Sequence, residues 1–381
     1  MTMTSSKEIY LFTFIGLALG VLLDILIRNQ STTLFYYAFI TLFSMLFALA
    51  YNGQNIASLI GSSFAAALLL SLPLIAIKFG FTTNRQAHTL SFLILYPVLA
   101  YIVHAFHYAH HHDQTWQVYY STLFAAVWNT IIVLSVAGLF SAIAEFLIML
   151  GAYAFKSLDY NFLWDWYFMN KHLRIIANST LFFVGIGVAY QNINIIYSIR
   201  FLLLRMMSFL FPILAVISIM YIILYIIPTS TSLNSHYPVP FIILLSLSVL
   251  GLIFFNAYFQ DGLTGMTPPR WLQILLRIYR VILFSIVLVT FYKLHKELPL
   301  NVNVLIALMA MVFFSATYAI TAFYPEAVEQ EWIPEGNIYT ALFFVVALFL
   351  VNIPYLPIDF NVGPGNSSTY TYEQKNNPPG Y

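Results

Sequence analysis

Residues 206–227 read MMSFLFPILAVISIMYIILYII, and this run contains no charged side chain. Its length matches the roughly 20 apolar residues that an α-helix needs to cross the ~30 Å hydrocarbon layer of a membrane. Only helices and closed barrels satisfy their backbone hydrogen bonds in lipid, and a barrel is typically built from short alternating segments, which this run is not. The run therefore predicts a transmembrane helix.

Similar apolar runs recur along the whole chain, separated by turn-forming residues. The candidate spans are 9–27, 33–51, 56–77, 89–107, 119–150, 175–190, 206–227, 240–259, 273–292, 302–323 and 338–356. The run 119–150 is too long for one upright helix, so we expect it to be tilted, broken or extended beyond the membrane. We predict an all-α, polytopic transmembrane bundle of about 10–11 spans over residues 1–359, followed by a flexible polar tail at 360–381.

The overall composition supports this class. Hydrophobic residues make up 61% of the 381 residues and charged residues only 8%, whereas a soluble domain carries about 25% charged residues. The formal net charge of +1, without a basic stripe, gives no case for binding nucleic acid. The absence of cysteine excludes disulfides and thiolate metal sites.

The distribution of lysine and arginine between the two sides of the membrane bears on whether the segment 175–190 crosses it. This segment is short and polar, carrying Asn178, Ser179 and Thr180. If the segment does not fully cross, the arginines that follow it, from Arg200 onward, lie on the cytoplasmic side. Most of the basic residues that precede the segment lie on that side too. We therefore predict that Lys171 and Arg200 face the same compartment, with the N-terminus outside.

The most unusual local feature is a run of histidines at 104, 107 and 110–112, followed by Asp113. On a helix, His104, His107 and His111 share one face, because they are spaced i, i+3 and i+7. Imidazoles at that spacing can ligate a transition metal or carry a proton. The alternative is that the cluster ends a span, where imidazoles lie comfortably at the interface.

Ionisable and amide side chains inside spans are costly in lipid and therefore point to function or to helix pairing. Glu145 has no basic residue nearby in sequence, so we expect its replacement by Gln to impair function more than Asp24→Asn. Asp24 has Arg28 four residues later and is interpreted as half of a local ion pair. Asn129 and Asn178 are candidates for interhelical hydrogen bonds.

Two segments between spans are polar or aromatic. Residues 156–174 mix charges with aromatic side chains, as in Trp164-Asp165-Trp166, which is typical of the headgroup layer. Residues 324–335 carry four carboxylates, which are interpreted as a solvated acidic loop rather than a hard-cation site. The acidic residues are Glu326, Glu329, Glu331 and Glu335.

A span ends in Asn256-Ala-Tyr-Phe-Gln260-Asp261-Gly262, and Arg270 and Arg277 follow after a proline pair. This block resembles a family of bacterial polytopic inner-membrane proteins that share an Asn-Ala-x-x-Gln-Asp-Gly motif followed by a helix with spaced arginines. The resemblance implies an inner-membrane location and a helical fold. The family has no established activity, so it implies no mechanism.

The leading functional hypothesis is a permease-like protein that binds or moves a small solute or ion between its helices, in contact with membrane lipids. The alternative is a non-catalytic component of membrane assembly or envelope maintenance, and a membrane-embedded lipid-modifying enzyme is the third. An enzyme is disfavoured because no nucleophile elbow, phosphate-binding loop, zincin motif or dinucleotide fingerprint is present.

Overall fold

The computed structural model describes residues 4–78, 86–226, 239–260, 269–297, 300–354 and 361–362. Within these ranges the chain is a helical bundle, which confirms the predicted fold class. Its helices are α1 (Thr4–Arg28), α2 (Leu34–Leu49), α3 (Ile56–Ser71), α4 (Gln86–Asp113), α5 (Tyr120–Lys156), α6 (Lys171–Gln191), α7 (Ile193–Ile226), α8 (Val239–Phe259), α9 (Arg270–Glu297), α10 (Val302–Thr321) and α11 (Glu326–Val351).

Short elements complete the described chain. The 3₁₀ turn η1 (Leu72–Leu74) follows α3, and the π-helical turn η2 (Trp164–Phe168) precedes α6. The strand β1 (Leu300–Asn301) pairs antiparallel with β2 (Asn361–Val362), which is the only part of the predicted polar tail that the structure describes.

Among the described residues, 10 helices are long and apolar enough to cross a membrane, and α2 is a shorter apolar helix of 16 residues. The chain is therefore an integral membrane protein. Each of the expected spans coincides with one of the eleven helices, because a long apolar run has no other way to satisfy its backbone in lipid.

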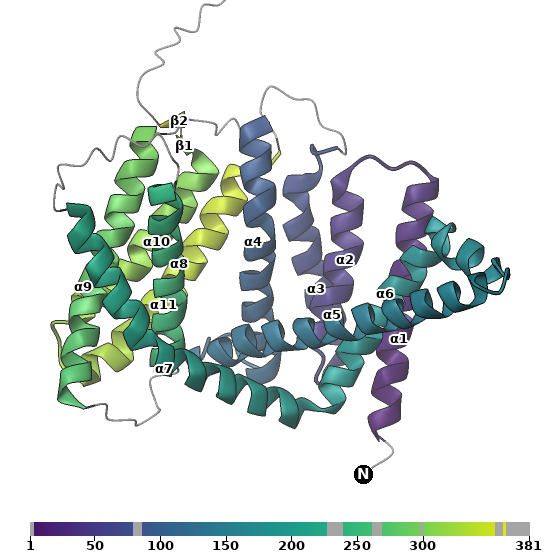
Figure 1. Cartoon of the computed structure of the whole chain (residues 1–381), viewed down its shortest axis with the longest axis horizontal. Coiled ribbons are helices and arrows are strands. Elements are labelled where there is room, and N and C mark those ends of the chain that lie inside the picture. The colour runs from purple at the N-terminus through teal and green to yellow at the C-terminus, as the bar shows by residue number, and fades with distance from the viewer. Residues whose placement is uncertain are drawn as a thin grey trace, which may run out of the picture.

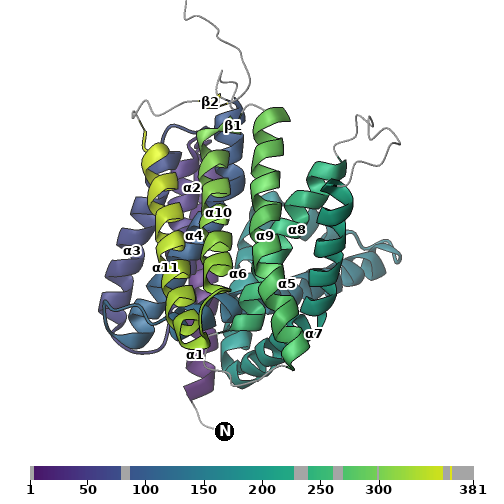
Figure 2. The same cartoon turned by 90° about the vertical axis from the view of Figure 1, so that its left-hand side faces the viewer.

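Most helices stand roughly side by side, but α5 lies obliquely across the others (Figure 1). The first part of α7 also runs along one end of the bundle before the helix turns upward, and Figure 2 shows α9, α10 and α11 as a nearly parallel group. The 37 residues of α5 form one unbroken helix. At 1.5 Å per residue this helix is far longer than the hydrocarbon layer is thick, which accounts for its tilt.

The helix pair α1–α6 forms the most extensive helix–helix contact. At one end His172 contacts Asp24, and at the other end Gly187 faces Phe12 and Ile9. Helix α6 thus runs antiparallel along most of α1. The two ends of α6 therefore lie near opposite ends of α1, and α6 is among the helices long and apolar enough to cross a membrane. That Lys171 and Arg200 face the same compartment stays a prediction.

The polar residues that made this segment look unsuited to lipid have partners in the structure. Asn178 accepts a hydrogen bond from Tyr167 at 3.0 Å, and Thr180 donates to the carbonyl of Ile176 at 2.7 Å. Their polarity is therefore satisfied within the protein, which removes the cost of crossing. Charge bias alone carried no information about these partners.

Among the apolar clusters of the described residues, three join the most helices. One surrounds Phe12 and joins α1, α2, α5, α6 and the start of α7, and another surrounds Phe92 and joins α2, α3, α4, α10 and α11. The third surrounds Tyr279 and joins the five helices α7, α8, α9, α10 and α11. Because α2, α7, α10 and α11 each contribute to two of these clusters, they connect the clusters to one another.

The two segments singled out between spans have different outcomes. Residues 326–335 are the first turns of α11 rather than a loop, with Pro334 inside the helix. In the segment 156–174, Trp166 is 62% exposed and the Lys156 ammonium lies 4.5 Å from the ring centroid of Trp164. An exposed aromatic surface with a cation beside it fits the predicted interfacial segment.

Candidate functional site

The C-terminal half of α4 carries the histidines, and α3 and α5 supply hydroxyl groups to them. We call the buried imidazoles His104, His107 and His111, with Ser62, Ser63 and Thr130, the histidine column. The imidazoles lie on successive turns of α4, so they extend inward from the helix end at Asp113 over about 10 Å. All three histidines are at least nine-tenths buried.

Each imidazole in the column contacts a hydroxyl group. The Ser62 hydroxyl lies 2.6 Å from Nε2 of His111 and 3.0 Å from Nε2 of His107, so it bridges the two rings. One turn deeper, Nε2 of His104 lies 3.0 Å from the Thr130 hydroxyl. Within the described residues, Nδ1 of His104 and Nδ1 of His107 are buried without a hydrogen-bond partner.

The histidine face that was predicted from spacing exists, but it does not form the predicted metal site. In the part of the chain that the structure describes, no group of three His, Asp or Glu side chains could hold a metal ion. His107 and His111 turn toward Ser62 of α3, whereas His104 turns toward Thr130 of α5. Helical spacing placed the residues on one face, but the neighbouring hydroxyls directed the rings to different partners.

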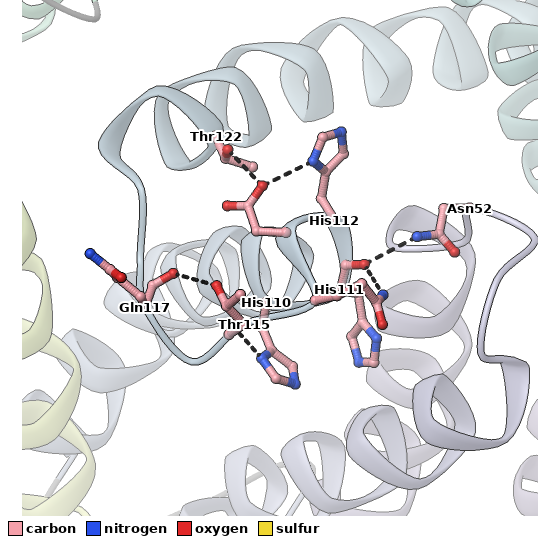
Figure 3. A network of polar contacts seen from close by, with 9 residues as sticks. Asn52, His110, His111, His112, Thr115, Gln117 and Thr122 are labelled. Carbon is pink, nitrogen blue, oxygen red and sulfur yellow. Dashed lines mark hydrogen bonds and ion pairs between the residues drawn. The ribbon is translucent and has the colours of Figure 1, made fainter.

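The other two histidines of the run are outside the column (Figure 3). His110 donates from Nδ1 to the carbonyl oxygen of Thr115 at 2.9 Å. His112 points to the other side of the helix, where its Nδ1 lies 3.1 Å from the Asp113 carboxylate, which also accepts from the Thr122 hydroxyl. These contacts close the end of α4 onto its connection to α5.

A pocket of about 270 Å³ lies beside the same end of α4. Aromatic rings dominate its lining, and we call it the tyrosine pocket. It is formed by the N-terminal part of α1, the end of α2, the end of α4 and the junction of α6 with α7. Its lining residues are Glu8, Phe12, Ala50, Tyr51, Asn52, Tyr108, His112, Tyr190, Ile193 and Tyr197.

The column and the pocket are coupled through α4 and the α2–α3 turn. The amide of Asn52 lines the pocket and donates to the carbonyl oxygen of His111 at 3.1 Å (Figure 3). The ring of Tyr108 lines the pocket and contacts the ring of His104 edge-on, with centroids 6.3 Å apart. The two sites therefore share a helix but use different faces of it.

The two candidate carboxylates within spans have very different surroundings. Asp24 is 5% exposed and receives a hydrogen bond from Arg28 Nε at 2.7 Å, which confirms the predicted local pair. Its other oxygen contacts Nδ1 of His172 on α6. Glu145 on α5 is half-buried and has no hydrogen bond or ion pair within the described residues. It lies near Tyr167, whose pKa is raised by burial and, to a smaller extent, by the negative charge of Glu145.

We expect Asp24→Asn to lower the thermal stability of the detergent-purified protein clearly more than Glu145→Gln does. The first change weakens two contacts, one of which joins α1 to α6, whereas the second removes none within the described residues. Thermal unfolding followed by intrinsic fluorescence measures both. Equal midpoints for the two variants would contradict this ranking. The sequence-based ranking for function, with Glu145 more important, stays a prediction.

The two asparagines predicted to pair helices both do so. Asn129 is buried, and its side-chain oxygen accepts from Arg200 of α7 at 3.1 Å. Asn178 accepts from Tyr167, as described above, and this ties α6 to η2. Neither amide lies in the histidine column or lines the tyrosine pocket.

The residues on which the family resemblance rests lie in two kinds of surroundings: Asn256 belongs to a buried hydrogen-bond network, and the arginines lie on the surface. Asn256 donates to the Tyr318 hydroxyl at 2.7 Å and accepts from Asn337 at 2.9 Å. Gln260 follows the last residue of α8 and has a left-handed φ of 54°, and Arg270 and Arg277 are exposed on α9. Asp261 and Gly262 lie outside the described residues, so the expected ion-pair cluster around Asp261 stays a prediction.

The arginine that does find a partner in this region is Arg280, one turn beyond Arg277. Its Nη2 donates to the Glu329 carboxylate of α11 at 2.7 Å, and Arg280 is only 4% exposed. Its guanidinium also lies 5.5 Å from the ring centroid of Phe255. One of the four carboxylates interpreted as solvated is therefore half of a buried ion pair.

Comparisons with protein-family models, curated proteins and solved structures give no match for this chain. The family resemblance carried by Asn256 and the residues after it therefore stays a prediction.

Sequence reasoning missed the tyrosine pocket and the network around Asn256. Neither has a local signal, because their members are scattered along the chain from α1 to α11. The close approach of α1 to α6 did have a signal: Gly16 and Gly20 form a Gly-x-x-x-Gly pattern, which is typical of tightly packed membrane helices.

Proposed function

We propose that this protein is permease-like and that the ion moved along the histidine column is the proton. The observation that carries the proposal is the pair of buried imidazoles, His104 and His107, each with one ring nitrogen that has no hydrogen-bond partner among the described residues. A buried polar atom without a partner costs about 1–3 kcal/mol, so such an atom calls for an explanation. Binding a proton or a water that carries one supplies it.

The column has the chemistry that proton transfer needs. An imidazole can accept a proton at one nitrogen and release one at the other, and a hydroxyl can donate and accept. Ser62 already bridges His111 and His107 within hydrogen-bond distance. Ionisable side chains inside membrane helices mark proton relays in many pumps and transporters. Residues 104 to 111 span about 10 Å along α4, roughly a third of the ~30 Å thickness of a hydrocarbon layer, so further groups are needed for a complete path across a membrane.

Proton flux into liposomes tests this function. Purified protein is reconstituted with a pH-sensitive dye trapped inside, and a potassium ionophore clamps the membrane potential. We expect the wild-type protein to pass protons faster than protein-free liposomes do. His107→Gln keeps a group that can hydrogen-bond Ser62 but cannot relay a proton, so we expect the flux to fall about tenfold or more, equivalent to about 1.4 kcal/mol in barrier height.

His110→Gln is the matched control, because His110 lies outside the column and its hydrogen bond within the described residues goes to the neighbouring loop carbonyl. Its ring packs against Trp116 and against the edge of His111, but it does not contact Ser62 or Thr130. We expect its flux to match the wild type. No flux above protein-free liposomes, or equal losses in the His107 and His110 variants, would overturn the proton-permease proposal.

A role in membrane assembly or envelope maintenance is the second candidate, and the surface around η2 favours it. Leu158, Tyr160, Phe162, Trp166 and Met169 are each more than 60% exposed. Such a surface fits either the headgroup layer or a protein partner. Loss of a co-purifying partner on Trp166→Ser, with proton flux unchanged, would favour the assembly role.

We also propose a bacterial inner membrane as the location. The support is the family resemblance together with the ten long apolar helices. Membrane fractionation of the native host, followed by detection of the untagged protein, tests this location.

A further inference from the structure

We propose that the tyrosine pocket binds an organic ammonium group. The pocket uses a face of α4 other than the histidine column, and this proposal does not depend on proton movement. None of the column residues lines the pocket, and five elements (α1, α2, α4, α6 and α7) converge to form it. Its volume of 270 Å³ is near the lower end of the range of about 300–1,000 Å³ that is usual for small-molecule sites.

The aromatic walls of the pocket hold one another in place. Phe12 stacks on Tyr190 with centroids 5.6 Å apart and planes at 4°, and it meets Tyr51 edge-on at 6.0 Å. The Tyr190 hydroxyl donates to the carbonyl oxygen of Leu49. Across the pocket, Tyr108 stacks on His112 at 5.7 Å. The rings are therefore fixed before a ligand arrives, which lowers the entropic cost of binding.

The charged residues that line the pocket determine which sign of charge a bound ligand carries. Glu8 is the only carboxylate among the lining residues, and it has no hydrogen bond or ion pair within the described part of the chain. No lysine or arginine is among the lining residues. Arg200, which lies over the Tyr197 ring at 5.4 Å, directs its Nη1 to Asn129. An unpaired carboxylate favours a cation in the pocket and disfavours an anion.

The aromatic lining selects the kind of cation. A metal ion such as Ca²⁺ or Mg²⁺ requires several oxygen ligands, and Glu8 is the only carboxylate that the lining supplies. A methylated ammonium carries its charge on an apolar surface, which aromatic faces bind through their negative quadrupole, and a carboxylate completes such a cage. The four tyrosines provide those faces, Phe12 is fully buried and supports them from behind, and Glu8 provides the counter-charge.

The ammonium group has two sources: a free solute, or the headgroup of a choline phospholipid in the surrounding membrane. Both offer the same trimethylammonium chemistry to Glu8 and the rings. The pocket lies at the ends of several helices, where headgroups are also found. The experiment therefore includes an arm for each source.

Binding is measured on the full-length protein. For the free solute, choline is titrated by calorimetry into protein in a maltoside detergent, which lacks an ammonium group, beside its uncharged isostere 3,3-dimethylbutan-1-ol. For the lipid, native mass spectrometry compares retention of phosphatidylcholine with phosphatidylglycerol. We expect choline or phosphatidylcholine to bind and the uncharged or anionic counterpart to bind at least about tenfold more weakly, a difference of about 1.4 kcal/mol.

Two variants and two controls connect binding to the pocket. Glu8→Gln removes the counter-charge, and Tyr197→Leu removes a ring that is 41% exposed, so neither change disturbs a fully buried side chain. We expect each to weaken ammonium binding about tenfold. Tyr10→Leu, at a ring that is 73% exposed on α1, and Glu331→Gln on α11 should leave binding unchanged.

The two arms separate the sources. Choline binding with no lipid preference assigns the pocket to a solute, and phosphatidylcholine retention with no choline binding assigns it to a lipid headgroup. Equal binding of choline and its uncharged isostere, no binding in either arm, or binding that survives both pocket variants overturns the proposal. Because proton flux is measured separately, failure here leaves the result for the histidine column standing on its own.

Discussion

Glu329→Gln is expected to destabilise the protein by about 3–5 kcal/mol, because it leaves the buried Arg280 guanidinium without a counter-charge. Arg280 is 4% exposed, and its Nη2 lies 2.7 Å from Glu329, whose side chain is 16% exposed. Arg280 Nε has no hydrogen-bond partner within the described residues, so Glu329 is the main compensation for burying this charge. Thermal unfolding of the purified protein, followed by tryptophan fluorescence, measures the loss.

Two further variants distinguish the loss of the ion pair from the general effect of removing a carboxylate from α11. Glu331→Gln lies two residues along the same helix, where the side chain is exposed, and should shift the midpoint by little. The double variant Arg280→Met/Glu329→Met removes both charges and should be more stable than Glu329→Gln, because no unpaired charge remains. A midpoint unchanged in Glu329→Gln would show that Arg280 is compensated elsewhere.

Gly16→Leu is expected to separate α1 from α6 and to lower stability by about 1–3 kcal/mol or more. A Cβ at residue 16 would lie 2.7 Å from the Cβ of Phe183, 2.8 Å from the carbonyl oxygen of Ser179 and 2.9 Å from the Cα of Thr180. Two of these atoms belong to the backbone of α6, so the helices must move apart. The midpoint of thermal unfolding in detergent measures the effect.

Gly61→Leu is the matched control for this change. Gly61 is also a helical glycine, on α3, but a Cβ there meets nothing within 4 Å. We expect the Gly61 variant to retain the wild-type midpoint or to gain slightly, because leucine favours a helix more than glycine does. Equal destabilisation in both variants would show that the close approach at Gly16 is not what costs stability.

Features carried by neighbouring residues could be predicted from the sequence. An apolar run coincides with part of each helix that the structure describes, since a run of about 20 apolar residues has few alternatives in lipid. The helix ends were less well predicted, as the first turns of α11 show. The pairing of Asp24 with Arg28 followed from the spacing of four residues on a helix. The histidine face on α4 was also predicted, because helical periodicity alone brings residues 104, 107 and 111 to one side.

Predictions failed where the partner is distant in the chain. The metal site required the three imidazoles to converge, but only His107 and His111 do so, at Ser62 of α3, whereas His104 turns to Thr130 of α5. The polarity of the segment 175–190 was also not informative by itself, because Tyr167 satisfies Asn178 and α6 extends beyond the apolar run. Glu329 appeared solvated until α11 placed it against Arg280.

The sequence by itself determined that this protein is a bundle of membrane helices, because the length and polarity of a segment decide whether its backbone can reside in lipid. Periodicity also determined which residues share a helix face. Only the tertiary structure decided what each face meets: the hydroxyls beside the histidines, the carboxylate beside Arg280 and the five elements around the tyrosine pocket. These partners depend on how helices distant in the chain pack, and packing is set by the shapes of all the faces together rather than by any one stretch of residues.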